Sequence, residues 1–238
     1  MATAKKILED SEYTDGYRKA CAASPVNSLS RKNMLYTPFF VPPYDQNRLS
    51  TYTYRIDLLN GSDIVILHSS ADNGYPHTRA PAVVCLPEEF VVNATDESLM
   101  ETLRHEAIHI HQRKYPDLWK QRLVADGWTP LSSDSLPKRF RDRCRINPDT
   151  MKCPFWAWQS YHVPLPMFKE AESLTLGDVR IEWFDTRTGA LFHEPPTSFT
   201  TKYGSPSQPE HPYEIYAIQY AAEGISSHSG LYSKLIES

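Results

Sequence analysis

The chain has 238 residues, of which 40% are hydrophobic and 23% are charged, and its formal net charge is −4. This length is enough for one large domain with a proper core, and the weakly acidic balance argues against binding to nucleic acid or to a membrane surface. The sequence contains no apolar run of roughly 18 residues and no signal-peptide core near Met1, so we expect a cytoplasmic protein.

The first part of the chain predicts a few short elements. Residues 1–50 read as a lead-in, with a helix expected from Tyr17 to Ala23. Three later segments favour β-strands: residues 52–59 alternate in hydrophobicity, and residues 64–68 and 82–86 are short apolar runs rich in β-branched side chains. Strands that precede a buried helix are typical of the α+β class. We therefore expect a small mixed β-sheet packed on the helix that follows.

That helix is predicted from the residues on either side of Glu101–Gln112. Asn93, Thr95 and Asp96 are candidate N-cap residues, and Pro116 provides a stop. At about 100° per residue, the apolar side chains fall on one side of the helix, which indicates that this side is buried. The apolar residues that share this spacing are Leu99, Met100, Leu103, Ala107 and Ile110.

The opposite side of the same helix carries His105-Glu106-Ala107-Ile108-His109, the H-E-x-x-H pattern. Residues four apart lie one above the other on a helix, so His105 and His109 can bind one metal ion, and Glu106 can reach a water bound to it. His111 lies roughly opposite His109 and cannot share that ion. The plainer interpretation is a pair of core histidines beside a surface carboxylate. Because an interior helix must provide partners for two His and a Glu, we favour the metal site.

Beyond this helix, the sequence predicts a single domain with long irregular connections. Residues 117–125 favour another helix. Residues 130–210 are rich in proline and show few regular patterns, so we expect a long irregular segment that lines the cleft. A last helix is expected from Pro212, which suits the first helical position, and its small residues Ala217 and Ala221 allow close packing against another helix.

A catalytic zinc usually has three protein ligands and a water, so a third ligand is needed. Glu214 is our choice, because it lies on the last helix, whose small-residue face can approach the first. A capping role for Glu214 at the positive end of the helix dipole is the alternative. The competing ligands are Glu223, Asp149, His162, His193 and His211.

Five cations between Lys138 and Arg145 lie in the segment between the two expected ligand helices. Most such runs are solvated surfaces. Arg145 differs because it precedes Asn147-Pro148-Asp149, a turn sequence that fixes the neighbouring backbone. A guanidinium in a fixed position pairs bidentately with a carboxylate. The hypothesis is that Arg145 binds an acidic group of the substrate.

These motifs together resemble the zincin metallopeptidases, and among them the gluzincin type, which takes a third ligand Glu from a later helix. The resemblance covers HEAIH from His105 to His109, the expected strands before it and Glu214. Metzincins have Gly and His where Gln112 and Tyr115 stand here, and the G-T-x-x-x-D of aspzincins does not follow. Gluzincins place an Asp near the ligand Glu, where this chain has Ile218.

The resemblance implies a Zn²⁺ enzyme that hydrolyses a peptide or small amide substrate, with Glu106 as general base and a Tyr or His as the group that stabilises the oxyanion. The candidates for the last role are Tyr161, His162, Tyr213 and Tyr216. Two other readings stay open. Two His and one carboxylate also form the Fe²⁺ site of non-heme iron enzymes that act on small molecules. A zincin-like fold can also be kept for binding without turnover.

Overall fold

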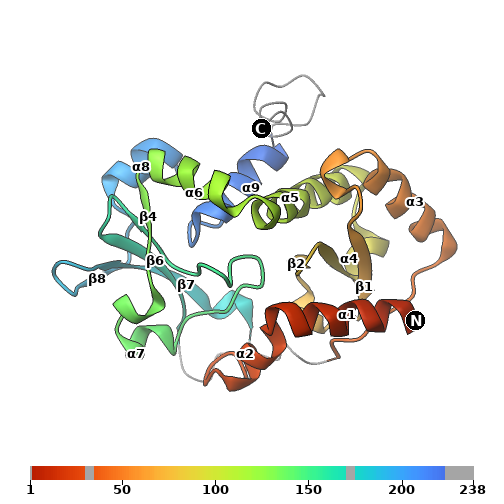
Figure 1. Cartoon of the computed structure of the whole chain (residues 1–238), viewed down its shortest axis with the longest axis horizontal. Coiled ribbons are helices and arrows are strands. Elements are labelled where there is room, and N and C mark those ends of the chain that lie inside the picture. Colours follow the sequence, from red (N-terminus) through yellow and green to blue (C-terminus); the bar gives the residue numbers. More distant parts are fainter. Residues whose placement is uncertain (1, 30–34, 170–174, 223–238) are drawn as a thin grey trace.

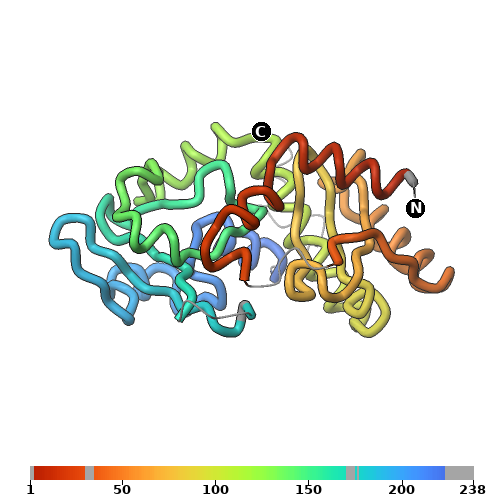
Figure 2. Tube along the Cα trace, turned by 90° about the horizontal axis from the view of Figure 1, so that it is seen from below, coloured from red at the N-terminus to blue at the C-terminus, as the bar shows by residue number. Residues whose placement is uncertain are grey.

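The longest helix in the described part of the chain, α5 (Asp96–Lys114), lies between two halves that each contain one β-sheet (Figure 1). The computed structural model describes residues 2–29, 35–169 and 175–222. Figure 2 shows the two halves side by side, with the N-terminal helix α1 along the outside of the first. The remaining helices are α1 (Ala2–Asp15), α2 (Tyr17–Ala23), α3 (Pro43–Tyr54), α4 (Glu88–Asn93), α6 (Pro116–Ala125), α7 (Lys138–Arg141), α8 (Thr197–Tyr203) and α9 (Pro212–Ala222).

The first sheet has three strands in the order β1-β3-β2, and it confirms the α+β prediction. β1 (Asp63–Leu67) runs parallel to β3 (Val83–Pro87), and β2 (His77–Arg79) runs antiparallel to β3. β1 and β3 agree with the strands predicted near residues 64–68 and 82–86. The apolar face of α5 packs in one core cluster with side chains from β3 and α3. Its members include Leu49, Val84, Leu86, Leu99, Leu103, Ala107 and Ile110.

The strand predicted for residues 52–59 is wrong. These residues end α3 and then form a short 3₁₀ helix, Asp57–Leu59. Alternation would place Tyr54 and Ile56 on the same side, yet Tyr54 is 85% exposed and Ile56 only 2%. Pro43 at the start of α3 and Asp45 in its first turn both favour the helix, which buries Leu49. Burial of the apolar face of α3 therefore outweighs the strand preference that the alternating hydrophobicity of residues 52–59 indicated.

The segment 130–210, expected to be irregular, contains most of a second sheet. Its strands are β4 (Trp128–Pro130), β5 (Trp156–Trp158), β6 (His162–Phe168), β7 (Val179–Asp185) and β8 (Leu191–Phe192), all antiparallel and in chain order. Proline normally interrupts a strand, and β6 contains Pro164 and Pro166. The carbonyl of Pro166 accepts from the Arg145 N–H, so this residue points away from β7. Its missing N–H therefore costs no bond between β6 and β7.

The two helices predicted after the motif are confirmed. α6 covers the segment expected at residues 117–125, and α9 begins at Pro212 as predicted. Ala217 and Ala221 are both buried in α9, which packs against α5. The two helices expected to carry the metal ligands are thus in direct contact. In the described residues, no helix is long and apolar enough to cross a membrane.

β2 was not predicted, because its sequence His-Thr-Arg is polar. The structure buries all three residues. Arg79 donates to Asp15 of α1 and to the hydroxyl of Tyr36, and it is paired with Glu12. His77 lies within hydrogen-bond distance of the Tyr36 hydroxyl, at 2.7 Å, and of the backbone carbonyl of Tyr75. This buried polar network attaches α1 to the first sheet.

The network predicts a pH dependence of stability. Burial opposes the charged form of His77, but Cys85, Asp72 and Asp149 together raise its pKa to about 9, from an ordinary value of 6.5. The stabilisation is therefore complete below pH 6.5 and is lost as the pH rises through 9. We expect His77→Gln to remove on the order of 3 kcal/mol of the change in unfolding free energy between pH 6 and pH 9.5. Urea unfolding of the wild type and the variant at both pH values measures this change. An equal change in the two proteins would contradict the prediction.

Candidate metal centre

Three side chains from α5 and α9 converge on one point. His105 and His109 are one helical turn apart on α5, and their Nε2 atoms are 3.0 Å from each other. Oε2 of Glu214, from α9, is 3.2 Å from each of these nitrogens. Among the described residues, this trio is the one group of His, Cys, Asp and Glu whose donor atoms all lie within 4.8 Å of one another. The structure thus brings together the three ligands predicted from the sequence.

The spacing of these donors suits a single small metal ion. Zinc bonds to His nitrogen and carboxylate oxygen at about 2.0–2.2 Å, so neighbouring ligands of a tetrahedral ion are roughly 3.3 Å apart. The observed separations of 3.0–3.2 Å are close to that value. Three ligands also leave a position open for water or substrate, as in catalytic zinc sites. The donor set and its geometry therefore fit zinc.

A hydrogen bond to Gln112 fixes the orientation of His109. The side-chain nitrogen of Gln112 donates to the backbone carbonyl of Tyr213, so its oxygen Oε1 faces the imidazole. Nδ1 of His109 lies 2.7 Å from that oxygen and must donate to it. In the neutral ring, Nε2 then carries the lone pair that a metal needs. Gln112 was not predicted to have a role.

A second amide orients Glu214 in the same way. Nδ2 of Asn147 donates to Oε1 of Glu214 at 2.6 Å, which leaves Oε2 toward the histidines. The Asn147 oxygen accepts from the backbone N–H of Asp149, and this bond fixes which way the amide points. Asn147 belongs to the Asn-Pro-Asp turn that the sequence indicated, although only its turn geometry was predicted. The turn therefore holds a metal ligand in place.

The charges of the site favour a carboxylate beside protonated histidine when no metal is present. Burial opposes the ionised form of Glu214, but His109 and His105 hold its pKa well below the usual range. Burial likewise opposes the charged form of His109, while Glu214 and Asp149 raise its pKa to about 10. A divalent cation replaces the proton in this arrangement, since it supplies the positive charge that Glu214 already stabilises.

Asn147→Ala should weaken zinc binding by about 10- to 100-fold, because the partners that orient metal ligands have effects of that size. Competition with a chromophoric chelator measures the affinity. Gln46→Ala is the control, since Gln46 donates to the backbone carbonyl of Val41 in the N-terminal half. Equal affinities of Asn147→Ala and the wild type would mean that Asn147 does not support the ligand.

Glu106 faces the same space without being one of the converging donors. It is 3% exposed, and its Oε2 has no hydrogen-bond partner in the part of the chain that the structure describes. Burial, with Asp149 and Glu214, raises its pKa well above the usual range, and His109 opposes the rise. In its ionised form, this carboxylate has an unused oxygen that can accept a proton from a molecule in the cavity, and a cation at the converging donors would favour that form.

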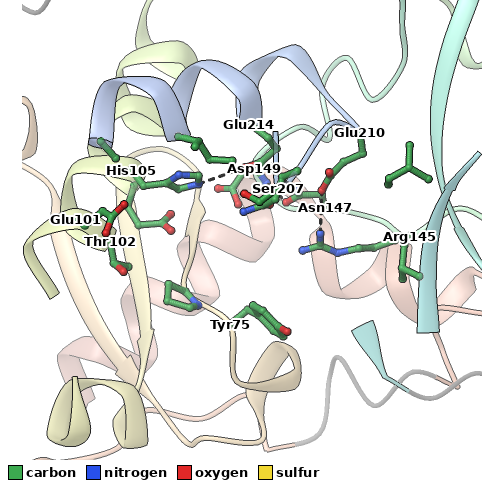
Figure 3. A pocket seen from close by; sticks show the side chains of 17 residues that line it. Tyr75, Glu101, Thr102, His105, Arg145, Asn147, Asp149, Ser207, Glu210 and Glu214 are labelled. Carbon is green, nitrogen blue, oxygen red and sulfur yellow. Dashed lines mark hydrogen bonds and ion pairs between the residues drawn. The ribbon is translucent and has the colours of Figure 1, made fainter. Parts of the chain in front are cut away.

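The cavity in front of these residues has a volume of about 550 Å³ (Figure 3). His105 lies on one side of the cavity and Arg145 lies across from it, with its guanidinium turned toward the open space. Glu106 also lines the cavity. Tyr75 lies on a third side. The carboxylates that line it are Glu101, Glu106, Asp149, Glu210 and Glu214. The cavity is thus predominantly acidic, with Arg145 as its one Lys or Arg among the described residues.

Of the five cations in the Lys138–Arg145 run, Arg145 is the one that lines the cavity. Its backbone N–H donates to Pro166 of β6, and the side chain of Asn27 bonds the backbone on either side of it. The Arg145 guanidinium is 3.5 Å from Oε1 of Glu210. Among the other cations, Lys138 pairs with Asp142 and Arg141 with Asp134, and Arg143 donates to the backbone carbonyls of Phe168 and Lys169. The structure therefore places Arg145 at the cavity, beside the carboxylate of Glu210.

Of the competing ligands within the described residues, the three histidines and Asp149 have other partners, and Asp149 accepts from the backbone N–H and the hydroxyl of Thr78. His162 is paired with Asp185 and His193 with Glu182 in the second sheet. Nε2 of His211 is bonded to a backbone carbonyl. Glu223 lies outside the described residues.

The four oxyanion candidates do not line the cavity in the described structure. Tyr161 and His162 lie at the far end of the second sheet, and Tyr213 and Tyr216 pack around Trp119. The hydroxyl-bearing aromatic that does line it is Tyr75, which precedes β2. No pattern around Tyr75 pointed to the site, because its position depends on how β2 pairs.

Searches against known protein families, curated proteins and solved structures find no match for this chain. The functional argument therefore depends on the geometry described above.

Proposed function

We propose that this protein is a zinc-dependent hydrolase of the zincin type that cleaves a peptide or small amide bond. One observation supports this most strongly. The two His of the H-E-x-x-H motif and Glu214 from a later helix converge within hydrogen-bond distances, beside a cavity that Glu106 also lines. A site for structural zinc normally closes around four protein ligands, whereas three ligands beside a cavity suit catalysis.

The roles of the residues follow from their positions. His105, His109 and Glu214 would hold the zinc ion, which would supply a bound water with a pKa lowered to about 7 and a Lewis acid for the scissile carbonyl. Glu106, whose Oε2 is unused, takes the proton of the attacking water and then passes it to the leaving amine. Arg145 and Tyr75, on the other walls, supply the donors nearest to the substrate. Gln112 and Asn147 keep the ligands oriented throughout.

The non-heme Fe²⁺ alternative has the same donor set of two His and one carboxylate. Glu106 separates the two candidates. An iron site needs no buried carboxylate next to its ligands, and burial of such a group costs free energy unless it has a use. We therefore rank hydrolysis first.

Isotope labelling distinguishes the candidates. The protein is reconstituted with zinc or, in a separate sample, with iron, and is incubated with a library of short N-acylated peptides in ¹⁸O-labelled water. Hydrolysis places one ¹⁸O in the new carboxylate of the zinc sample. A second iron sample is kept in unlabelled water under ¹⁸O₂. Products that take up label only in this sample would identify the oxidative alternative. Metal binding with no product in either sample would identify a fold kept for binding.

Arg145 gives a prediction about substrate charge. If its guanidinium binds a substrate carboxylate, Glu210 competes for the same group. Arg145→Lys should then lower kcat/KM for a substrate with a free carboxylate by about tenfold or more, with little effect on its amide counterpart. Glu210→Gln should raise kcat/KM for the carboxylate substrate. Equal effects on both substrates would show that the pair is structural.

A further inference from the structure

The edge of the first sheet beside the cavity is formed by β2. The strand order β1-β3-β2 leaves one side of β2 without a strand. Tyr75 and Pro76, which lead into β2, line the cavity, and Asp149 from the opposite wall bonds to Thr78 within β2. An extended peptide can bind such an edge by adding a strand, because the outward N–H and C=O groups are normally free.

At the outward positions of β2, no backbone N–H is free to bind a peptide. Thr78 donates its N–H to Asp149 at 2.8 Å, which shows that this residue points away from β3. Because a strand alternates, residues 76 and 80 point the same way. Pro76 has no N–H, and Ala80 donates its N–H to Asp15 at 3.0 Å. A peptide laid along this edge would find no backbone donor at three successive outward positions.

Two cavities lie along this edge, and Asp149 belongs to the lining of both. The first cavity lies at the Tyr75 end of β2, and a second, of about 400 Å³, lies at the Ala80 end. Asp149 lines both cavities, and Glu106 and Gln112 lie on opposite sides of it, the former in the first and the latter in the second. The residue that caps the Thr78 N–H therefore lines both cavities.

We propose that the substrate is a short peptide or small amide held by side chains in the first cavity, and that Asp149 excludes extended polypeptides by capping β2. This inference rests on the proposed function. A volume of about 550 Å³ is in the ordinary range for small-molecule sites, so the cavity can bury such a substrate without help from the sheet edge. Recognition then depends on its acidic walls, Arg145 and the metal.

The test uses peptide hydroxamates of one to five residues, which bind zinc through the hydroxamate and need no turnover. Their affinity for the zinc-loaded wild type is measured by calorimetry. We expect the affinity to stop rising after about two or three residues, when the cavity is full. An affinity that rises with every residue up to five would overturn the proposal. A hydroxamate that binds at no length would instead count against the proposed zinc site.

Two variants at position 149 identify the cause. Asp149→Ala frees the Thr78 N–H, so five-residue ligands should gain about tenfold over two-residue ligands, as expected for one new backbone hydrogen bond. Asp149→Asn keeps an oxygen that can accept from Thr78 but has no charge. The dependence of its affinity on ligand length should match that of the wild type. Length dependence as flat in Asp149→Ala as in the wild type would show that Asp149 does not close the edge.

Discussion

Glu106→Gln should leave the metal in place and lower kcat for hydrolysis by about 10²- to 10⁴-fold, the usual contribution of a general base. The amide keeps the size of the side chain but cannot take the proton of the attacking water. Its Oε2 has no partner in the described structure, so the substitution breaks no hydrogen bond. The measurement combines kcat at saturating substrate with the metal content of the same sample.

Glu101→Gln is the matched control for this variant. Glu101 lines the same cavity, lies on the same helix and is not one of the converging donors. We expect it to change kcat far less than Glu106→Gln does. Glu106→Gln protein with wild-type activity would rule out the base role, whatever the metal. Loss of the metal from it would mean that Glu106 is a ligand.

Glu214→Ala should weaken zinc binding by at least about a thousand-fold. The binding free energy of a four-ligand structural zinc site is about 10–16 kcal/mol, so one ligand contributes several kcal/mol. The variant also removes the carboxylate that now compensates the buried His109 and the half-buried His105. Zinc should therefore raise the melting temperature of the wild type and have little effect on Glu214→Ala, because only the wild type gains binding energy in the folded state.

Glu210→Gln is the control here, since Glu210 lies four residues before Glu214, in the turn that precedes α9, and lines the same cavity but pairs with Arg145. Its zinc affinity should stay within a few-fold of the wild type. Zinc affinity that falls in Glu210→Gln and persists in Glu214→Ala would move the third ligand to Glu210 and contradict the assembled site.

The centre of the site was predictable because its residues lie on helices with strong local signals. The apolar spacing around Leu103 and Ala107 fixed which side of α5 carries His105 and His109, and Thr95 caps the helix as the sequence allowed. Pro212 and the small residues of α9 pointed to a helix that can approach α5 closely. Such patterns depend on neighbours within one or two turns.

The supporting residues were not predictable in the same way. Gln112 and Asn147 acquire their roles from Tyr213 and Glu214, which are distant in sequence. The polar side chains of β2 find hydrogen-bond partners in α1 and Tyr36, so they can be buried. A search for alternating hydrophobic residues could therefore not reveal this strand. Most of the second sheet was missed because proline normally breaks strand pairing, whereas Pro166 of β6 faces away from β7 and costs no bond between these strands.

Elemental analysis of protein purified without added metal tests the central claim most directly. The assembled site predicts about one zinc per chain in the wild type and less than a tenth of that in the double variant His105→Ala, His109→Ala. Full occupancy in the double variant would show that the metal binds elsewhere. Iron in place of zinc in the wild type, with activity that depends on oxygen, would keep the three ligands and contradict the hydrolytic function.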